Sequence, residues 1–425
     1  MAALARCGFA LIFFAAQLAP AAPVSVEVKK TPQGWTLLRD GKPYFVRGVG
    51  GAGHLDLAVA IGANSVRTWG VEHAQEVLDD AQKHGMTVML GLWLDKEMDG
   101  FDYNDAARVQ RQFETLKAAI DRYKDHPALL MWGVGNELDL HSANPRVWDA
   151  VEQLARYAHR VDPHHPVVTV VAGVHAEALA QIGQRAPDVD VLGVNAYGNV
   201  AGVRGELDAA GWRGPYLITE WGVNGPWESP TTSWGVAIEP TSTQKRAMFE
   251  QRYAQAVAAQ RDRCLGSYAF LWGSKQEYTE TWFGLFAKDG MPTEPIDGLQ
   301  RAFTGRYPPR RAAEVVALTV DGKRANDSVR LHPGQKVSAE LDVRSSSSSG
   351  ASMVFAWKLI EESADKKIGG AAERVPNEIP LAFEHGAESR VSFVAPAKPG
   401  AYRLFASVFV NGRLSYANLP FEVVR

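Results

Sequence analysis

Residues 129–137 read Leu129-Leu130-Met131-Trp132-Gly133-Val134-Gly135-Asn136-Glu137. A short continuous apolar run of this kind predicts a strand that is buried on both faces, as in a parallel sheet. The polar residues Asn136 and Glu137 follow where that strand ends. The stretch therefore predicts a buried strand with a carboxylate at its C-terminal end.

A second stretch repeats this arrangement, reading Tyr216-Leu217-Ile218-Thr219-Glu220-Trp221-Gly222. A single glutamate after a strand is more simply a solvated carboxylate or a helix cap. Two of them in matching contexts favour catalysis, because a glycosidase needs one carboxylate to attack an acetal carbon and one carboxylic acid to protonate the leaving oxygen. The pair therefore indicates glycoside chemistry.

Apolar runs alternate with helical patterns from about residue 44 to residue 305. One clear helix is expected from Asp105 to Tyr123, with apolar residues spaced by three and four. Eight such units predict a (β/α)8 TIM barrel, an α/β fold. The alternative is a doubly wound open sheet, but no Gly-rich phosphate turn follows the first strand. The expected strands are Tyr44–Val49, Asn64–Thr68, Thr87–Trp93, Leu129–Val134, Val167–Val171, Val191–Asn195, Tyr216–Thr219 and Ser267–Trp272.

The character of the chain changes after residue 305. Residues 306–313 contain Pro308-Pro309 and are expected to form a linker. Apolar and polar residues then alternate, and turns such as Asn411-Gly412 indicate antiparallel strands. We expect an immunoglobulin-like β-sandwich over 314–425, with a surface loop at Ser345–Ser349. The barrel domain is then expected over residues 23–305.

The first 22 residues resemble a secretory signal. Arg6 precedes a mostly apolar stretch from Cys7 to Leu18, and Ala19-Pro20-Ala21 fits a cleavage site. The alternative is an N-terminal membrane anchor, and no other segment is long and apolar enough to span a bilayer. We therefore expect a secreted or periplasmic protein with no stable membrane insertion.

Composition limits the partners. The net charge is −3, and no basic patch dominates, so nucleic acid is not an expected partner. Cysteine and histidine residues do not cluster at metal-ligand spacing, so we expect no catalytic metal, and no motif suggests another cofactor.

Polar and aromatic residues gather at the expected strand ends, where barrel enzymes carry their chemistry. We expect one glutamate to be protonated, through burial and repulsion from its partner, and the other to stay ionised. Arg67 and Tyr197 could hold the ionised carboxylate, although a structural ion pair and simple packing are the alternatives. Besides Glu137 and Glu220, the candidates for binding an oligo- or polysaccharide are Arg67, Trp69, Trp93, Asn136, Asn195, Tyr197, Trp221, Trp227, Trp272 and Trp282.

These residues also carry a family resemblance. Asn136-Glu137, Glu220, Arg67, Tyr197 and Trp272 resemble the pattern of clan A of the glycoside hydrolases, which are retaining (β/α)8 enzymes. The resemblance implies that Glu137 is the acid/base and Glu220 the nucleophile, that Asn136 binds the sugar 2-hydroxyl, and that Trp272 forms the platform under the −1 sugar. Asn195-Ala196-Tyr197 resembles family 2, whereas the β-domain after the barrel is similar to the β-1,3-glucanosyltransferase families.

The expected function is a secreted retaining β-glycosidase, with a β-glucan as the first choice of substrate. Two alternatives stay open. A β-glucan transglycosylase would use the same carboxylate pair, and a non-catalytic carbohydrate-binding protein could retain the barrel without its activity.

Overall fold

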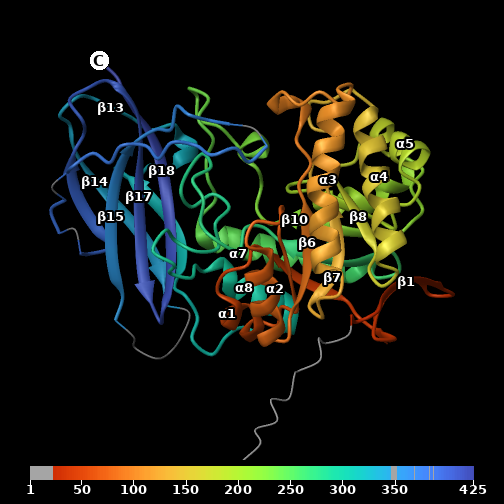
Figure 1. Ribbon diagram of the computed structural model, residues 1–425. Helices are drawn as coiled ribbons and strands as arrows, with labels where there is room; N and C mark the ends of the chain where they lie inside the picture. Colours follow the sequence, from red (N-terminus) through yellow and green to blue (C-terminus); the bar gives the residue numbers. More distant parts are fainter. Residues whose placement is uncertain (1–22, 346–351, 368, 382, 386) are drawn as a thin grey trace, which may run out of the picture.

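The computed structural model describes residues 23–345, 352–367, 369–381, 383–385 and 387–425 (Figure 1). The expected signal segment and residues 346–349 of the expected serine-rich loop lie outside this part. No helix within the described ranges combines the length and the apolar character needed to cross a membrane.

Eight parallel strands close into a barrel, in the order β10-β11-β4-β5-β6-β7-β8-β9. The TIM barrel expected from the sequence is confirmed, and each of the expected strands overlaps one of these. The last strand ends at Ala269 rather than Trp272, which matters for the site below. The strands are β4 (Val46–Gly50), β5 (Ser65–Arg67), β6 (Thr87–Leu92), β7 (Leu129–Val134), β8 (Val167–Ala172), β9 (Val191–Asn195), β10 (Tyr216–Trp221) and β11 (Cys264–Ala269).

Helices surround the barrel, and Figure 1 shows α3, α4 and α5 side by side on its outer face. The helix expected over Asp105–Tyr123 is α3, and the Asp105 carboxylate caps it by accepting from Ala107 N at 3.0 Å and Arg108 N at 3.1 Å. The helices are α1 (Leu55–Ala60), α2 (Ala74–Lys83), α3 (Ala106–Tyr123), α4 (Arg146–Val161), α5 (Ala176–Arg185), α6 (Val203–Ala209), α7 (Ser242–Arg252) and α8 (Pro295–Thr304). Short 3-10 or π segments are η1 (Glu97–Asp99), η2 (Val200–Gly202), η3 (Pro226–Glu228), η4 (Tyr253–Val257), η5 (Ala258–Gln260) and η6 (Ala325–Asp327).

A small antiparallel sheet before the barrel was not expected from the sequence. It contains β1 (Val26–Thr31), β2 (Gly34–Arg39) and β3 (Lys42–Pro43). Val26 and Leu37 join the apolar cluster that fills the barrel interior. The amide of Val26 also donates to the carbonyl of His164 at 2.8 Å, at the entrance to β8. The sheet therefore covers the end of the barrel opposite the strand C-termini.

Two further sheets follow the barrel. One has the order β12 (Glu314–Val320), β14 (Lys336–Arg344), β16 (Arg390–Val394), and the other β13 (Arg330–Leu331), β18 (Arg413–Val423), β17 (Gly400–Val410), β15 (Val354–Glu361). All pairings are antiparallel except β13 with β18. Leu341 and Phe393 of one sheet share a core with Leu404 and Phe421 of the other, so the sheets pack as a sandwich.

The sandwich lies beside the barrel, against α7 (Figure 1). A buried ion pair of the barrel, Lys245 Nζ to Glu239 Oε1 at 2.5 Å, lies at this junction. Asn418 of β18 donates to the other oxygen of Glu239 at 2.5 Å, and the Tyr416 hydroxyl donates to the carbonyl of Thr281 at 3.1 Å. The two parts of the chain are therefore joined through a buried polar network.

Candidate active site

Glu220 lies at the end of β10 and is surrounded by donors. Its Oε1 accepts from Arg67 Nη1 at 3.0 Å and from the Trp69 indole at 2.8 Å. Its Oε2 accepts from the Tyr197 hydroxyl at 2.7 Å. Three donors, one of them cationic, stabilise the negative charge on this buried carboxylate.

Arg67 is held rigidly at the end of β5. Nη1 also donates to the carbonyl of Thr219 at 2.7 Å, and Nη2 donates to the Asn136 amide oxygen at 2.6 Å. The guanidinium lies over the Trp69 ring, 5.2 Å from its centroid. Arg67 therefore links β5 to the ends of β7 and β10 while it pairs with Glu220.

Glu137 has a different environment. Its Oε1 accepts from Asn195 Nδ2 at 3.0 Å, and its Oε2 lies 3.6 Å from Lys96 Nζ. Burial is the largest influence and raises the pKa of Glu137, and the nearby charge of Glu220 raises it further, against the opposing effects of Asn195, Lys96 and Arg67. The protonated form of Glu137 is thus favoured, whereas Glu220 is surrounded by hydrogen-bond donors.

The turn after β7 aims Glu137 at the site. Gly135 and Glu137 both adopt left-handed backbone conformations, with φ of 74° and 52°. Glycine accepts this conformation at little cost, and a Cβ at Gly135 would lie 2.4 Å from Leu138 Cδ1. The amide of Glu137 donates to the carbonyl of Val170 at 2.8 Å, which fixes the turn against β8.

Asn136 and Asn195 connect the two carboxylates. The Asn136 amide oxygen accepts from Arg67 and, at 3.1 Å, from Asn195 Nδ2. Since that oxygen is occupied, the amide nitrogen is the group of Asn136 that can reach a ligand. The Asn195 amide oxygen accepts from the Thr219 hydroxyl at 2.8 Å, so Asn195 is oriented from β10.

Phe270 is the aromatic residue of the site that the sequence analysis missed. Its ring packs edge-on against Trp69 at 5.9 Å and Tyr197 at 6.0 Å, the two aromatic donors to Glu220. Phe270 is the first residue after β11, because the strand ends at Ala269. The expected strand Ser267–Trp272 included Phe270 in its interior, so Trp272 and not Phe270 was taken as the residue at the strand end.

Trp272, which was predicted to form the platform under the −1 sugar, is buried and directed at other groups. Its side chain is 2% exposed, its indole donates to the carbonyl of Gly53 at 2.7 Å, and its ring packs edge-on against Phe286 at 4.9 Å. The structure places Phe270, and not Trp272, beside the residues that hold Glu220.

Two other tryptophans predicted to bind substrate are also buried elsewhere. Trp221 packs against Phe249 of α7 at 5.4 Å, because adjacent residues of a strand point to opposite faces and Glu220 faces the barrel axis. Trp282 is 1% exposed and donates to the carbonyl of Asn224 at 2.9 Å. Both side chains are packed inside the protein, away from the carboxylate pair.

Trp227 and Trp93 remain accessible at the rim. Trp227 is 63% exposed, and its ring lies edge-on to Tyr197 at 5.8 Å. Trp93 is half-buried, and Lys96 Nζ lies 5.4 Å from its ring centroid. Both rings are close to groups that contact the carboxylate pair.

Charged groups on the loops around the site were not predicted from the sequence. Lys96 follows β6, and Lys275 and Glu277 follow β11, where Lys275 Nζ and Glu277 Oε2 lie 2.9 Å apart. Lys275 also donates to the carbonyl of Gly370 at 2.7 Å, so the β15–β16 connection of the sandwich reaches the rim of the barrel. Isolated loop residues give no periodic signal, which explains the omission.

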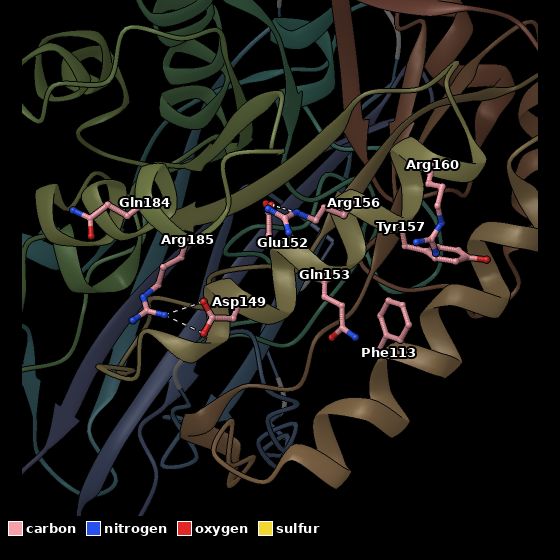
Figure 2. Close-up of a pocket in the computed structure, with 9 residues that line it drawn as sticks. All are labelled: Phe113, Asp149, Glu152, Gln153, Arg156, Tyr157, Arg160, Gln184 and Arg185. Atoms are coloured by element: carbon pink, nitrogen blue, oxygen red, sulfur yellow. Dashed lines mark hydrogen bonds and ion pairs between the residues drawn. The ribbon is translucent and has the colours of Figure 1, made fainter.

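A hollow of about 760 Å³ lies elsewhere, on the outer surface formed by α3, α4 and α5 (Figure 2). Two of its arginines pair with carboxylates of the same surface, with Arg156 Nε 2.6 Å from Glu152 Oε1 and Arg185 Nη1 2.9 Å from Asp149 Oδ1. None of the strand-end candidates lines this hollow, so it is separate from the carboxylate pair. Within the described residues, no three His, Cys, Asp or Glu side chains form a group that could hold a metal ion.

The fold and site define a TIM barrel with paired carboxylates at the C-terminal ends of β7 and β10. Residues 54–224 match the family described as glycosyl hydrolases family 2, TIM barrel domain. The chain is 26% identical to a β-glucuronidase of Pongo abelii over 196 residues, covering 41% of this chain and 28% of that protein. It is 26% identical to a β-glucuronidase of Paenibacillus borealis over 267 residues, covering 60% of this chain and 43% of that protein.

A solved structure, the β-D-glucuronidase of Dictyoglomus thermophilum, is similar in fold. It has a TM-score of 0.52 and 19% identity, and the match covers 67% of this chain and 54% of that one. The chain spans less than half of the length of the two curated relatives. Together with the family match, these similarities support a barrel of the glycoside hydrolase type.

Proposed function

We propose that this chain is a retaining β-glycosidase of clan A. The observation that carries the proposal is the contrast between the two carboxyl groups, since three donors bind Glu220 whereas burial and repulsion favour a proton on Glu137. Retaining glycosidases require this division between a nucleophile and an acid. An intact polar network around both groups disfavours a purely carbohydrate-binding role.

In the first step, a Glu220 oxygen bonds to the anomeric carbon while the bond to the leaving oxygen breaks, and Glu137 gives that oxygen its proton. In the second step, Glu137 takes a proton from water. The resulting hydroxide bonds to the anomeric carbon, and the bond to Glu220 breaks. When the bond between Glu220 and the sugar breaks, Arg67, Trp69 and Tyr197 again donate hydrogen bonds to the free carboxylate of Glu220.

The remaining residues would bind the sugar. The Asn136 amide nitrogen would meet the 2-hydroxyl, and Phe270 would lie against the apolar face of the −1 ring. The names of the relatives favour a β-linked uronide as substrate, in preference to the β-glucan expected from the sequence. We further propose that residues 23–305 are the catalytic domain, that 306–313 link it to a sandwich over 314–425, and that the protein is exported to the periplasm or beyond.

Transglycosylation is a second candidate, because the exposed ring of Trp227 beside Tyr197 could hold an acceptor sugar. When the hydroxyl of an acceptor sugar reaches the covalent intermediate before water, Glu137 takes its proton, its oxygen bonds to the anomeric carbon, and the bond to Glu220 breaks, so the glycosyl group is transferred to that sugar. Products longer than the substrate would identify this activity.

The test uses the full chain with Glu137→Ala and an aryl β-glucuronide, an aryl β-glucoside and a β-glucan as substrates. Added azide should restore turnover of an activated aryl substrate and yield a β-glycosyl azide, because azide needs no general base. Glu220→Gln should not be rescued in this way. An α-glycosyl azide from Glu137→Ala would mean that Glu137 is the nucleophile and Glu220 the acid/base. A wild-type protein that cleaves none of these substrates would contradict the proposal.

A further inference from the structure

Lys96 is a buried ammonium group with no hydrogen-bond partner among the described residues. The residue is 3% exposed and follows β6 at the rim of the barrel. Removing an ammonium group from water is costly unless other groups replace its hydration. The equally buried Lys245 meets this requirement, because it contacts Glu239, two backbone carbonyls and the Tyr416 hydroxyl.

The nearest acidic group to this unpaired ammonium is the candidate acid/base. Lys96 Nζ lies 3.6 Å from Glu137 Oε2, beyond hydrogen-bond distance but close enough for a strong charge interaction. Asp139 is the other carboxyl group close enough to interact with Lys96; its Oδ1 accepts from the amide of Ala172 at 3.0 Å, whereas its buried Oδ2 has no hydrogen-bond partner among the described residues. Arg67, the other cation of the site, is committed to Glu220.

The sandwich covers the Lys96 ammonium group, whereas the Glu137 side chain stays 14% exposed. Gly369, in the β15–β16 connection, lies so close that an added Cβ would be 3.7 Å from Lys96 Nζ and 3.6 Å from Met98 Sδ. Because Nζ has no access to solvent, its charge is poorly screened and a substrate group cannot easily reach it. The position therefore suits an electrostatic role better than a binding one.

We propose that Lys96 is a positioning residue that stabilises the carboxylate form of Glu137 between the two chemical steps. This proposal rests on the proposed function, in which Glu137 must release a proton and then accept one. An acid held too firmly in its protonated form would fail as a base. The titratable and charged groups that face Glu137 are Arg67 from β5, Lys96 after β6, Tyr197 after β9 and Glu220 from β10. Asp139, in the same loop as Glu137, interacts with Lys96.

The test compares Lys96→Met, which fills the same space without charge, with Lys96→Arg and with Lys398→Met. A dinitrophenyl glycoside makes the second step limiting, because its leaving group needs no proton. Lys96→Met should lower kcat ~10-fold at mildly acidic pH and recover as the pH rises, since a tenfold change corresponds to one pKa unit. The limb of the pH profile that Glu137 sets should shift to higher pH in Lys96→Met. Lys96→Arg should restore the wild-type profile, and Lys398→Met should leave the profile in place, because Lys398 is 80% exposed on the sandwich.

A second measurement does not depend on turnover. Carboxyl-labelled glutamate in the full chain allows Glu137 to be titrated by NMR, with Glu137→Gln identifying its signal. Its titration should move to higher pH in Lys96→Met. An unchanged titration overturns the proposal even if the enzyme is active, whereas a chain without glycosidase activity overturns the proposed function alone. If Lys96→Met loses turnover of a uronide but not of a glucoside with an unchanged pH profile, Lys96 binds the substrate anion and the proposal is wrong.

Discussion

The Asn195 amide nitrogen donates to Glu137 Oε1 at 3.0 Å, while its amide oxygen accepts from the Thr219 hydroxyl at 2.8 Å. Thr219 immediately precedes Glu220 on β10, so one amide group connects the surroundings of both carboxylates. A donor to a carboxylate favours its ionised form, and Asn195 therefore opposes the effect of burial on Glu137.

Asn195→Ala should make Glu137 a weaker acid. The substitution removes a hydrogen bond that lowers the pKa of Glu137, so this pKa should rise and the basic limb of kcat/KM should move to higher pH. Activity at the optimum should fall ~10-fold, as expected for one lost charge-assisted bond. Thr219→Val, which only loosens the orientation of Asn195, should cause a smaller shift in the same direction, and a shift to lower pH would contradict this account.

Glu137→Gln should stabilise the fold at neutral pH. The pKa of Glu137 is raised in the folded protein above its ordinary value of 4.5, so the folded state binds more protons than the unfolded state above pH 4.5. Stability is then lost as the pH rises through the folded pKa, and glutamine avoids this loss. The midpoint of thermal unfolding should exceed that of the wild type at neutral pH, and the difference should diminish below pH 4.5. A lower midpoint at neutral pH would mean that ionised Glu137 stabilises the fold.

Trp69→Phe should weaken catalysis without unfolding the barrel. The phenyl ring preserves packing against Phe270 but removes the indole donor to Glu220. We expect kcat/KM to fall ~10–100-fold, since a hydrogen bond to a charged group contributes about 1.5–3 kcal/mol. Trp221→Phe is the matched control, because its indole nitrogen has no partner among the described residues and faces α7. Equal losses in the two variants would show that the donor to Glu220 is unimportant.

Lys245→Met should destabilise the junction of barrel and sandwich. It leaves the buried Glu239 carboxylate without its cation, and loss of one partner of a buried pair costs about 3–5 kcal/mol. Urea unfolding should show the decrease, whereas Lys398→Met, from a pair that is 80% and 39% exposed, should change little. A chain that ends near Arg306 should also be less stable, because it lacks Asn418 and Tyr416 from the same network.

Gly369→Val should impair activity although Gly369 belongs to the sandwich. Its φ is 68°, and an added Cβ would already be 3.4 Å from Leu140 Cδ2, so a branched side chain must push the connection away from Lys96. We expect the pH profile to change as turnover falls several-fold. Gly412→Val is the control, since Gly412 has φ 74° and nothing within 4 Å of an added Cβ. The same loss in both variants would point to backbone strain alone.

The sequence by itself determined the barrel and the positions of both glutamates. Buried parallel strands are continuous apolar runs, and the ends of such strands meet at one rim of a barrel, so Glu137 and Glu220 could be placed near each other with Arg67 and Tyr197. The sandwich was visible because alternation has a period of two. These features are local and repeated, and for that reason they can be read along the chain.

Only the tertiary structure decided which aromatic rings face the site. Glu220 and Trp221 are adjacent on β10, so their side chains point to opposite faces of the strand. Because β11 ends at Ala269, Phe270 rather than Trp272 lies beside the carboxylate pair. Lys96, Lys275 and Gly369 meet near the rim although they come from distant loops and, for Gly369, from the sandwich. Such contacts depend on how elements pack, which no periodicity in the sequence records. The buried junction around Glu239 and Lys245 likewise required the assembled fold.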